Sequence, residues 1–148
     1  MAYESLLKKR AYNPAFAERG REDVVMIDVL TIRDGEHLKL VFEKTNSKWS
    51  QGVWMLTDRG LLVNDRLCPS VNIWQEGAPQ EVLIQCHTED GILSLYNIWD
   101  KGQGKQSQSY SSGMLVEELP NGRRYYCNDI GFETSFDKLV FRIERMGN

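Results

Sequence analysis

Three Asp-Gly or Asn-Gly dipeptides constrain this chain more than any other feature of its sequence. Asp34-Gly35, Asp90-Gly91 and Asn121-Gly122 each lie between stretches rich in Val, Ile, Leu and Tyr. Such dipeptides suit the type I′ turn, in which both central residues need a positive φ and the twist matches that of paired strands. The pattern therefore predicts a series of β-hairpins, and a fourth turn signal, Asp58-Arg59-Gly60, divides a further β-rich stretch.

Ten short strands follow from these turn signals. They are expected at residues 24–33, 36–44, 52–57, 60–64, 70–75, 80–88, 92–99, 113–119, 123–129 and 138–145. Strands of this length and spacing are typical of an antiparallel sandwich or barrel. We predict an all-β fold, an antiparallel β-sandwich of the jelly-roll type, in which residues 1–148 form a single domain.

The residues beside two of these turns separate into an apolar and a polar face. A two-residue turn places residues that oppose each other across the hairpin on one face of the sheet. Around Asp90-Gly91 the apolar face contains Val82, Ile84, Cys86, Leu93, Leu95, Asn97 and Trp99. Around Asp34-Gly35 the apolar face contains Val25, Ile27, Val29, Leu38, Leu40 and Phe42, and the polar face contains Met26, Asp28, His37, Lys39 and Glu43. Each hairpin therefore predicts one side that faces the core.

Only the N-terminal segment, residues 1–20, has a helical pattern. Tyr3 to Tyr12 is expected to form about two turns of helix before Asn13-Pro14, because proline disfavours helical geometry in the residue that precedes it. A second short turn is expected at residues 14–19. Helices this short are marginal alone, so the segment should pack on the sandwich.

Composition argues against several classes of partner. The chain has 18 Lys and Arg against 21 Asp and Glu, a formal net charge of −3, which disfavours a nucleic-acid partner. No stretch approaches the roughly 20 apolar residues of a membrane span, and the first residues lack the apolar run of a secretory signal. Three cysteines fit a reducing compartment better than a disulfide framework. We expect a cytoplasmic protein without a nucleic-acid or membrane partner.

Few residues form patterns that carry catalytic chemistry. Cys86 and His87 are adjacent, but neighbours on a strand point to opposite faces and cannot form a dyad. The scattered cysteines and two histidines lack zinc-ligand spacing, and no Gly-rich loop precedes a helix. The sequence therefore predicts neither a metal site nor a cofactor. Loop carboxylates are the remaining catalytic candidates, namely Asp100, Asp129 and Glu133, with Arg123 or Arg124.

Residues 100–113, DKGQGKQSQSYSSG, interrupt the compact strands with a polar stretch. They form either a linker with a hydrophilic edge strand at 106–112 or a binding loop, since loops this long in compact domains are often functional. Trp99, Asp100 and Tyr110 flank or occupy this stretch, and Asn97 lies shortly before it on the apolar face, where a buried amide must find a partner.

Aromatic residues supply the second indication of a ligand site. Trp54, Trp74 and Trp99 are expected in the core, because aromatic side chains provide much of its buried area. Trp49 lies in the polar sequence Asn46–Ser50, where a core role is hard to arrange, and an exposed ring can stack on a sugar. The predicted ligand-binding residues are therefore Trp49, Asn97, Trp99, Asp100 and Tyr110.

Residues 127–141, CNDIGFETSFDKLVF, resemble the approach to the last strand in some calcium-dependent β-sandwich modules. In those modules, oxygen ligands from a loop hold Ca²⁺ ahead of the strand. The chain departs from their pattern at Ser135, Asp137 and Lys138, which replace an acid, an Asn and a second acid. The resemblance implies a closing β-strand, and a cation near Asp129 and Asp137 would lose ligands and gain a positive neighbour.

The sequence is compatible with three functions. The preferred one is a non-catalytic module that binds a carbohydrate or another small polar ligand. The second is a small enzyme in a β-barrel or cupin-like frame that uses the loop carboxylates. The third is a self-associating interaction subunit, a homodimer, because Met26, Leu30, Ile32 and Val41 would be apolar groups on the outer face of the first hairpin.

Overall fold

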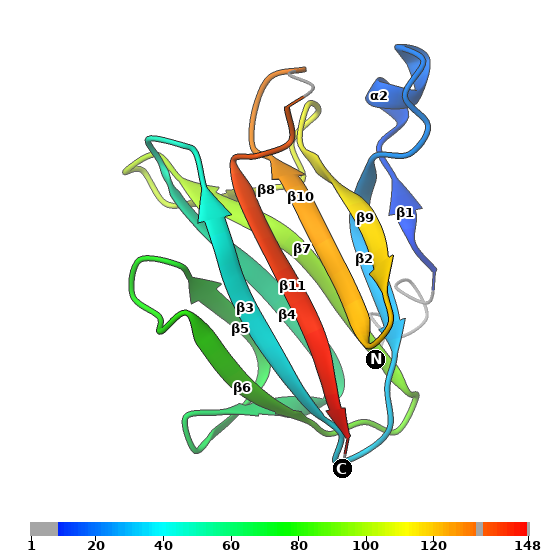
Figure 1. Ribbon diagram of the computed structural model, residues 1–148, viewed down its shortest axis with the longest axis vertical. Coiled ribbons are helices and arrows are strands. Elements are labelled where there is room, and N and C mark those ends of the chain that lie inside the picture. Colours follow the sequence, from blue (N-terminus) through cyan, green and yellow to red (C-terminus); the bar gives the residue numbers. More distant parts are fainter. Residues whose placement is uncertain (1–8, 133–134, 148) are drawn as a thin grey trace.

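The computed structural model describes residues 9–132 and 135–147, which form one short helix and eleven strands (Figure 1). The helix, α2, spans Pro14–Glu18. The strands are β1 (Ala11–Tyr12), β2 (Val25–Thr31), β3 (His37–Thr45), β4 (Ser50–Val63), β5 (Arg66–Trp74), β6 (Glu81–Cys86), β7 (Ile92–Asp100), β8 (Lys105–Ser107), β9 (Gly113–Leu119), β10 (Gly122–Asn128) and β11 (Leu139–Gly147). The all-β prediction is confirmed.

Eight of these strands close into an antiparallel barrel, in the order β2-β9-β10-β11-β3-β6-β4-β7. The ring closes because β7 pairs with β2 along residues 28–31. The other three strands lie outside the ring, β1 on β2, β5 on β4 and β8 on β7. The predicted jelly-roll sandwich is therefore wrong. Pairing the first ring strand with the last satisfies main-chain edges that an open sheet would leave exposed.

The strands of the first two predicted hairpins exchange partners. β2 pairs with β7 and β3 pairs with β6, whereas the sequence predicts pairs between β2 and β3 and between β6 and β7. The two connections meet at one end of the barrel, where the Gly35 amide donates to the Cys86 carbonyl at 2.7 Å. The Ile32 amide likewise donates to the Gly91 carbonyl at 2.9 Å. Both predicted registers are wrong, because each strand satisfies its main chain with a strand from the other connection.

Burial confirms the apolar faces predicted for β3, β6 and β7, but not for β2. The predicted core residues of those three strands, Leu38, Leu40, Phe42, Val82, Ile84, Cys86, Leu93, Leu95, Asn97 and Trp99, are all buried. In β2, Leu30 and Asp28 are buried although they were expected on the outer face, while Ile27 and Val29 are only half-buried.

The apolar patch predicted to drive self-association is not on the surface. Leu30 and Ile32 belong to the barrel core, and Val41 is also buried. Met26 is half-buried. The predicted exposed apolar patch, on which the expectation of a homodimer rested, is therefore wrong.

The remaining turn signals give mixed results. The hairpin predicted at Asn121-Gly122 is confirmed, but its turn residues are Pro120-Asn121, because Leu119 pairs with Gly122. Asn121 does not have the positive φ that the predicted type I′ turn requires. Asp58-Arg59-Gly60 bends the single strand β4 instead of separating two strands, and the pairing of β4 with β5 shifts there. The actual turn follows at Asn64-Asp65, where both residues have positive φ values of 51° and 62°. Asn and Asp adopt this region more readily than other non-glycine residues.

The N-terminal segment is less helical than predicted. The helix expected at Tyr3–Tyr12 falls partly on residues 1–8, outside the described residues, and its last two positions form β1. The turn expected at 14–19 is confirmed as α2, whose Ala15 amide donates to the side-chain oxygen of Asn13 at 2.9 Å. Within the described ranges, no helix is long and apolar enough to cross a membrane.

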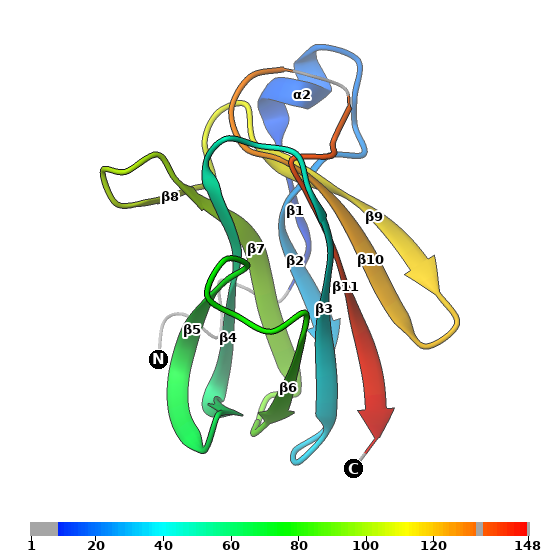
Figure 2. The ribbon, with the colours of Figure 1, turned by 60° about the vertical axis from the view of Figure 1, so that its left-hand side comes forward.

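Side chains fill the interior of the barrel. Trp99, Tyr125 and Phe141 are among the largest fully buried residues, and the Tyr125 and Phe141 rings stack with centroids 4.8 Å apart. A smaller cluster that includes Phe16 and Phe136 docks α2 on the end of the barrel drawn uppermost in Figures 1 and 2. Because side chains fill the interior, a ligand site lies either at an end of the barrel or on its outer wall.

The ring is weakest at the seam between β2 and β9. These strands share one residue pair, Val25 opposite Met114, before β2 turns away toward β7. Arg123 of β10 reaches across the seam and donates to the Val29 carbonyl at 2.9 Å. A side chain therefore supplies a hydrogen bond to β2 where the ladder with β9 has ended.

A buried carboxylate organises this seam. Asp28 is fully buried and accepts hydrogen bonds from Arg10 at 2.6 Å and Arg123 at 2.9 Å. It also accepts one from the Tyr125 hydroxyl at 2.7 Å. Burial, together with this carboxylate, holds the pKa of Tyr125 well above its ordinary value. Glu118 is the second acidic partner of both arginines.

Candidate functional site

The connections at the upper end of the barrel meet around a hollow of about 590 Å³. Figures 1 and 2 both show the β3–β4 and β10–β11 connections side by side at this end. The hollow is lined by Thr45, Asn46, Ser47, Lys48, Trp49, Asp129, Ile130 and Lys138. Two segments that are about 80 residues apart in sequence therefore build one concave surface, as the hydrogen bond between Ser47 and Asp129 shows.

Asp129 is the most deeply buried polar residue of this lining, with 2% of its surface exposed. Its Oδ2 atom accepts hydrogen bonds from the Ser47 hydroxyl and the Gln51 side-chain amide, each at 3.0 Å. Its Oδ1 atom accepts one from the Ile130 amide at 2.7 Å. Three donors thus compensate for burying this carboxylate.

Trp49 lies half-buried in the same lining, and its loop is anchored on Asp129. The Trp49 amide donates to the Ser47 hydroxyl oxygen at 3.2 Å, and this hydroxyl in turn donates to Asp129. The ammonium groups of Lys48 and Lys101 lie 5.7 Å and 5.2 Å from the centroid of the indole ring. The geometry therefore places the Trp49 ring, with a cation from Lys48 and one from Lys101 beside it, in the same lining as the fixed Asp129 carboxylate.

Buried amides lie next to this carboxylate. Gln51 and Asn128 are 1% and 0% exposed, and among the described residues Gln51 Oε1 and Asn128 Oδ1 accept no hydrogen bond. Asn97 donates through its side chain to the Asn128 carbonyl at 3.0 Å. This end of the core is therefore polar, unlike the aliphatic middle of the barrel.

The predicted site residues Trp99 and Asp100 lie at the same end but have structural partners. Trp99 is fully buried, and its indole N–H donates to the Gln106 side chain at 3.1 Å. Asp100 is half-buried and accepts from the amides of Gly102 and Gly104 at 2.7 Å and 3.1 Å. Both glycines have φ values above 100°, so Asp100 closes a tight turn that leads into β8.

Tyr110 lies apart from the hollow. Its side chain is 67% exposed, and its ring contacts the edge of Phe132 at a centroid distance of 5.2 Å. Its carbonyl accepts a hydrogen bond from Asn13, which caps α2. The structure thus brings Trp49, Asn97, Trp99 and Asp100 to one end, whereas Tyr110 belongs to the α2 side of that end and does not line the hollow.

The residues considered for catalysis do not converge. Arg123 pairs with Asp28 at the β2–β9 seam, and Arg124 pairs with Glu43 on the outer wall. Asp100 bonds to its own turn, and Asp129 bonds to Ser47 and Gln51. Glu133 lies outside the described residues.

The cation suggested by the calcium-module resemblance finds no ligand cluster in the part of the chain that the structure describes. There, no group of three or more His, Cys, Asp or Glu residues is placed to hold a metal. Asp137 accepts a hydrogen bond from Asn46 at 2.8 Å, and this hydrogen bond is the largest cause that holds the pKa of Asp137 below its ordinary value of 3.8.

Sequence reasoning missed Ser47, Lys48 and Gln51. Gln51 could have been found by alternation, because it shares a strand face with the buried residues Val53 and Met55. A polar residue on a core face is the same signal that selects Asn97. Ser47 and Lys48 have no such pattern, and only the meeting of two distant connections gives them a role.

No protein-family model, no curated protein and no solved structure matches this chain. Only the geometry of the site itself therefore bears on the function.

Proposed function

We propose that this protein binds a small hydroxylated ligand, a carbohydrate, in the hollow at the upper end of the barrel and does not transform it. The observation that carries the proposal is the placement of the half-buried Trp49 ring beside the buried, fully anchored carboxylate of Asp129. An aromatic ring offers an apolar face to a pyranose, and Asp129 holds the loop that carries this ring through Ser47.

The hydrogen bonding of Asp129 supports binding rather than catalysis. A general base must reach the substrate with a free acceptor, whereas Asp129 is 2% exposed and accepts three protein hydrogen bonds. Lys48 is exposed beside the ring and can donate to ligand hydroxyls. A reducing compartment such as the cytoplasm is part of the proposal, and the three free cysteines support it.

Titration with a panel of neutral and acidic mono- and oligosaccharides, followed by tryptophan fluorescence and calorimetry, tests this proposal. Trp49→Ala should weaken binding at least about tenfold, as loss of an aromatic anchor does, without changing the melting temperature by more than a few degrees. Tyr110→Ala is the matched control, because it removes an exposed ring at the same end outside the hollow.

The saccharide affinity of Tyr110→Ala shows how far the site extends. An unchanged affinity confines the site to the hollow, whereas a weakened affinity extends it to the 100–113 segment. No binding of any saccharide at millimolar concentration, or binding that Trp49→Ala leaves intact, refutes the proposal.

A further inference from the structure

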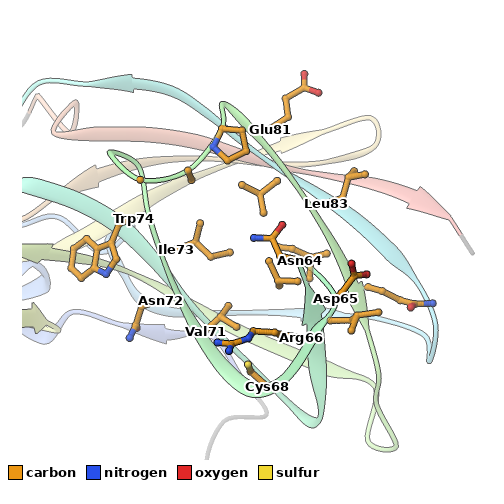
Figure 3. A pocket seen from close by; sticks show the side chains of 18 of the residues that line it. Asn64, Asp65, Arg66, Cys68, Val71, Asn72, Ile73, Trp74, Glu81 and Leu83 are labelled. Carbon is orange, nitrogen blue, oxygen red and sulfur yellow. The ribbon is translucent and has the colours of Figure 1, made fainter.

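A second concave surface lies on the wall of the barrel, away from the upper hollow. It is a groove of about 730 Å³ between β5 and β6. Figure 3 shows side chains of the two strands around it, with Asn64 and Asp65 of the β4–β5 turn and Arg66, the first residue of β5. Its apolar lining includes Ile73, Val82 and Ile84, which belong to the barrel core, and Val71, which packs against that core.

The β6 side of the groove presents unpaired main-chain groups. In an antiparallel ladder, the main-chain groups of successive residues point to opposite neighbours. The Cys86 amide donates to the Glu36 carbonyl at 2.8 Å, on the β3 side, so Val82 and Ile84 also direct their main chain toward β3. Glu81 and Leu83 therefore direct their amides and carbonyls away from β3. Within the described residues β4 pairs with β6 only at residues 85 and 86, which leaves Glu81 and Leu83 without a strand partner.

The β5 side has the same property. β5 pairs with β4 alone among the described strands. The Gln75 amide donates to the Gln51 carbonyl at 2.9 Å, which sets the alternation along β5. Ile73 and Val71 therefore bond toward β4, and the main chain of Asn72 faces the free edge. Two strand edges with unused hydrogen-bonding groups thus border one apolar floor.

Charge and exposure point to the kind of occupant. Leu83 of β6, which lines the groove, is 63% exposed, a large value for leucine beside an apolar surface. At the turn end of the groove, Arg66 has no ion-pair partner among the described residues, and Figure 3 shows its side chain on the β5 side beside Val71. An occupant with an acidic group at this end would complement that charge.

We propose that the groove binds an extended segment of another protein, which adds as a strand to the free edge of β6. Main-chain hydrogen bonds to Glu81 and Leu83 would provide affinity. Every second side chain of the segment would be apolar and would pack on Val71, Ile73, Val82 and Ile84. A segment antiparallel to β6 begins at the turn end, so its acidic residue precedes the alternating part. This proposal is independent of saccharide binding at the upper hollow.

The peptide acetyl-Asp-Val-Thr-Val-Thr-Val-amide is a direct probe of this site. Amide hydrogen exchange of the full chain, measured with and without the peptide, should show new protection at Glu81 and Leu83. The amides of Val82 and Ile84 already bond to β3 and should not change. This alternation distinguishes an added strand from an apolar molecule in the groove, which would not protect every second amide.

Leu83→Pro provides a matched test, because it removes one of the two β6 amides that face the groove and leaves the bonds to β3 in place. It should weaken peptide binding about fivefold or more, the effect of losing one hydrogen bond. Leu83→Thr is the control, since it shortens the exposed side chain but keeps the amide. If Leu83→Pro does not fold, a peptide with N-methyl groups on the bonding amides makes the same test on the native protein.

Three results overturn the proposal: no binding at millimolar peptide, equal binding of the N-methylated peptide, or equal protection at all four amides. Light scattering tests whether a second copy of the chain occupies the groove instead. A dimer that Leu83→Pro dissociates would assign this edge to a second copy of the chain and would also refute the proposal.

Discussion

The buried carboxylate at the β2–β9 seam gives the sharpest test of the fold. Asp28→Asn keeps the shape of the side chain but removes the charge that faces Arg10 and Arg123. Removing one partner of a buried ion pair costs about 3–5 kcal/mol. The two arginine side chains are 28% and 23% exposed and keep Glu118 as a partner, so water and that carboxylate offset part of the loss. The free energy of unfolding should therefore fall by about 2–4 kcal/mol.

Thermal and urea unfolding measure this change. For a chain of this size each kcal/mol corresponds to about 2–4 °C, so the melting temperature should fall by roughly 4–16 °C. Glu118→Gln is the control, because its side chain is 66% exposed and its ion pairs should be worth less than about 1 kcal/mol. If Asp28→Asn is no more destabilising than Glu118→Gln, the carboxylate does not hold the seam and the reasoning fails.

Three further predictions concern the strands and their connections. Gly122→Ala would place a Cβ atom in steric overlap with the Ile143 carbonyl oxygen of β11 and should cost about 2 kcal/mol or more in urea unfolding. Gly77→Ala, with nothing within 4 Å, should cost less than about 1 kcal/mol, and equal effects would contradict the close packing of β10 on β11. Iodoacetamide at pH 8 should modify only Cys68 in the native protein, because the other thiols are buried and burial raises the pKa of Cys86 to about 12. Modified Cys86 in the mass spectrum of the native protein would contradict this prediction. Burial raises the pKa of Asp58, but hydrogen bonds from a hydroxyl and two backbone amides of the β6–β7 connection outweigh it and leave the pKa below 3.8. The stability that this group contributes is therefore present above pH 3.8 and is lost as the pH falls through the folded pKa. Asp58→Asn should lose less unfolding free energy in acid than the wild type, and an identical loss would count against the contact.

Local physics accounts for what could be predicted about the strands. Side chains alternate between faces along any strand, so the buried set of β6 and β7, from Val82 to Trp99, follows from the chain alone. The hairpin before Gly122 also follows, because its two strands are joined by the shortest connection and pair directly. These predictions need no knowledge of which other strand lies alongside.

The candidate site was only partly predictable for the same reason. Trp49 and Asn97 stand out as an aromatic residue in a polar loop and a polar residue on an apolar face. Their relation to Asp129 does not, because it depends on the β3–β4 connection meeting the β10–β11 connection at one end of the ring. Tyr110 lies in the expected loop but on the other side of that end.

The sequence by itself determined that this chain is all-β, where most of its strands lie and which side chains of β3, β6 and β7 face inward, because these properties depend on residues within a few positions of one another. Only the tertiary structure decided that β2 pairs with β7 and β3 with β6, that the sheet closes into a barrel, and that Asp28 is buried. An Asp-Gly dipeptide has the same local preference for a turn whether the two strands beside it pair with each other or pair with other strands. The choice is made by closure, which gives each of the eight strands a neighbouring strand on both sides and is therefore a property of the whole chain.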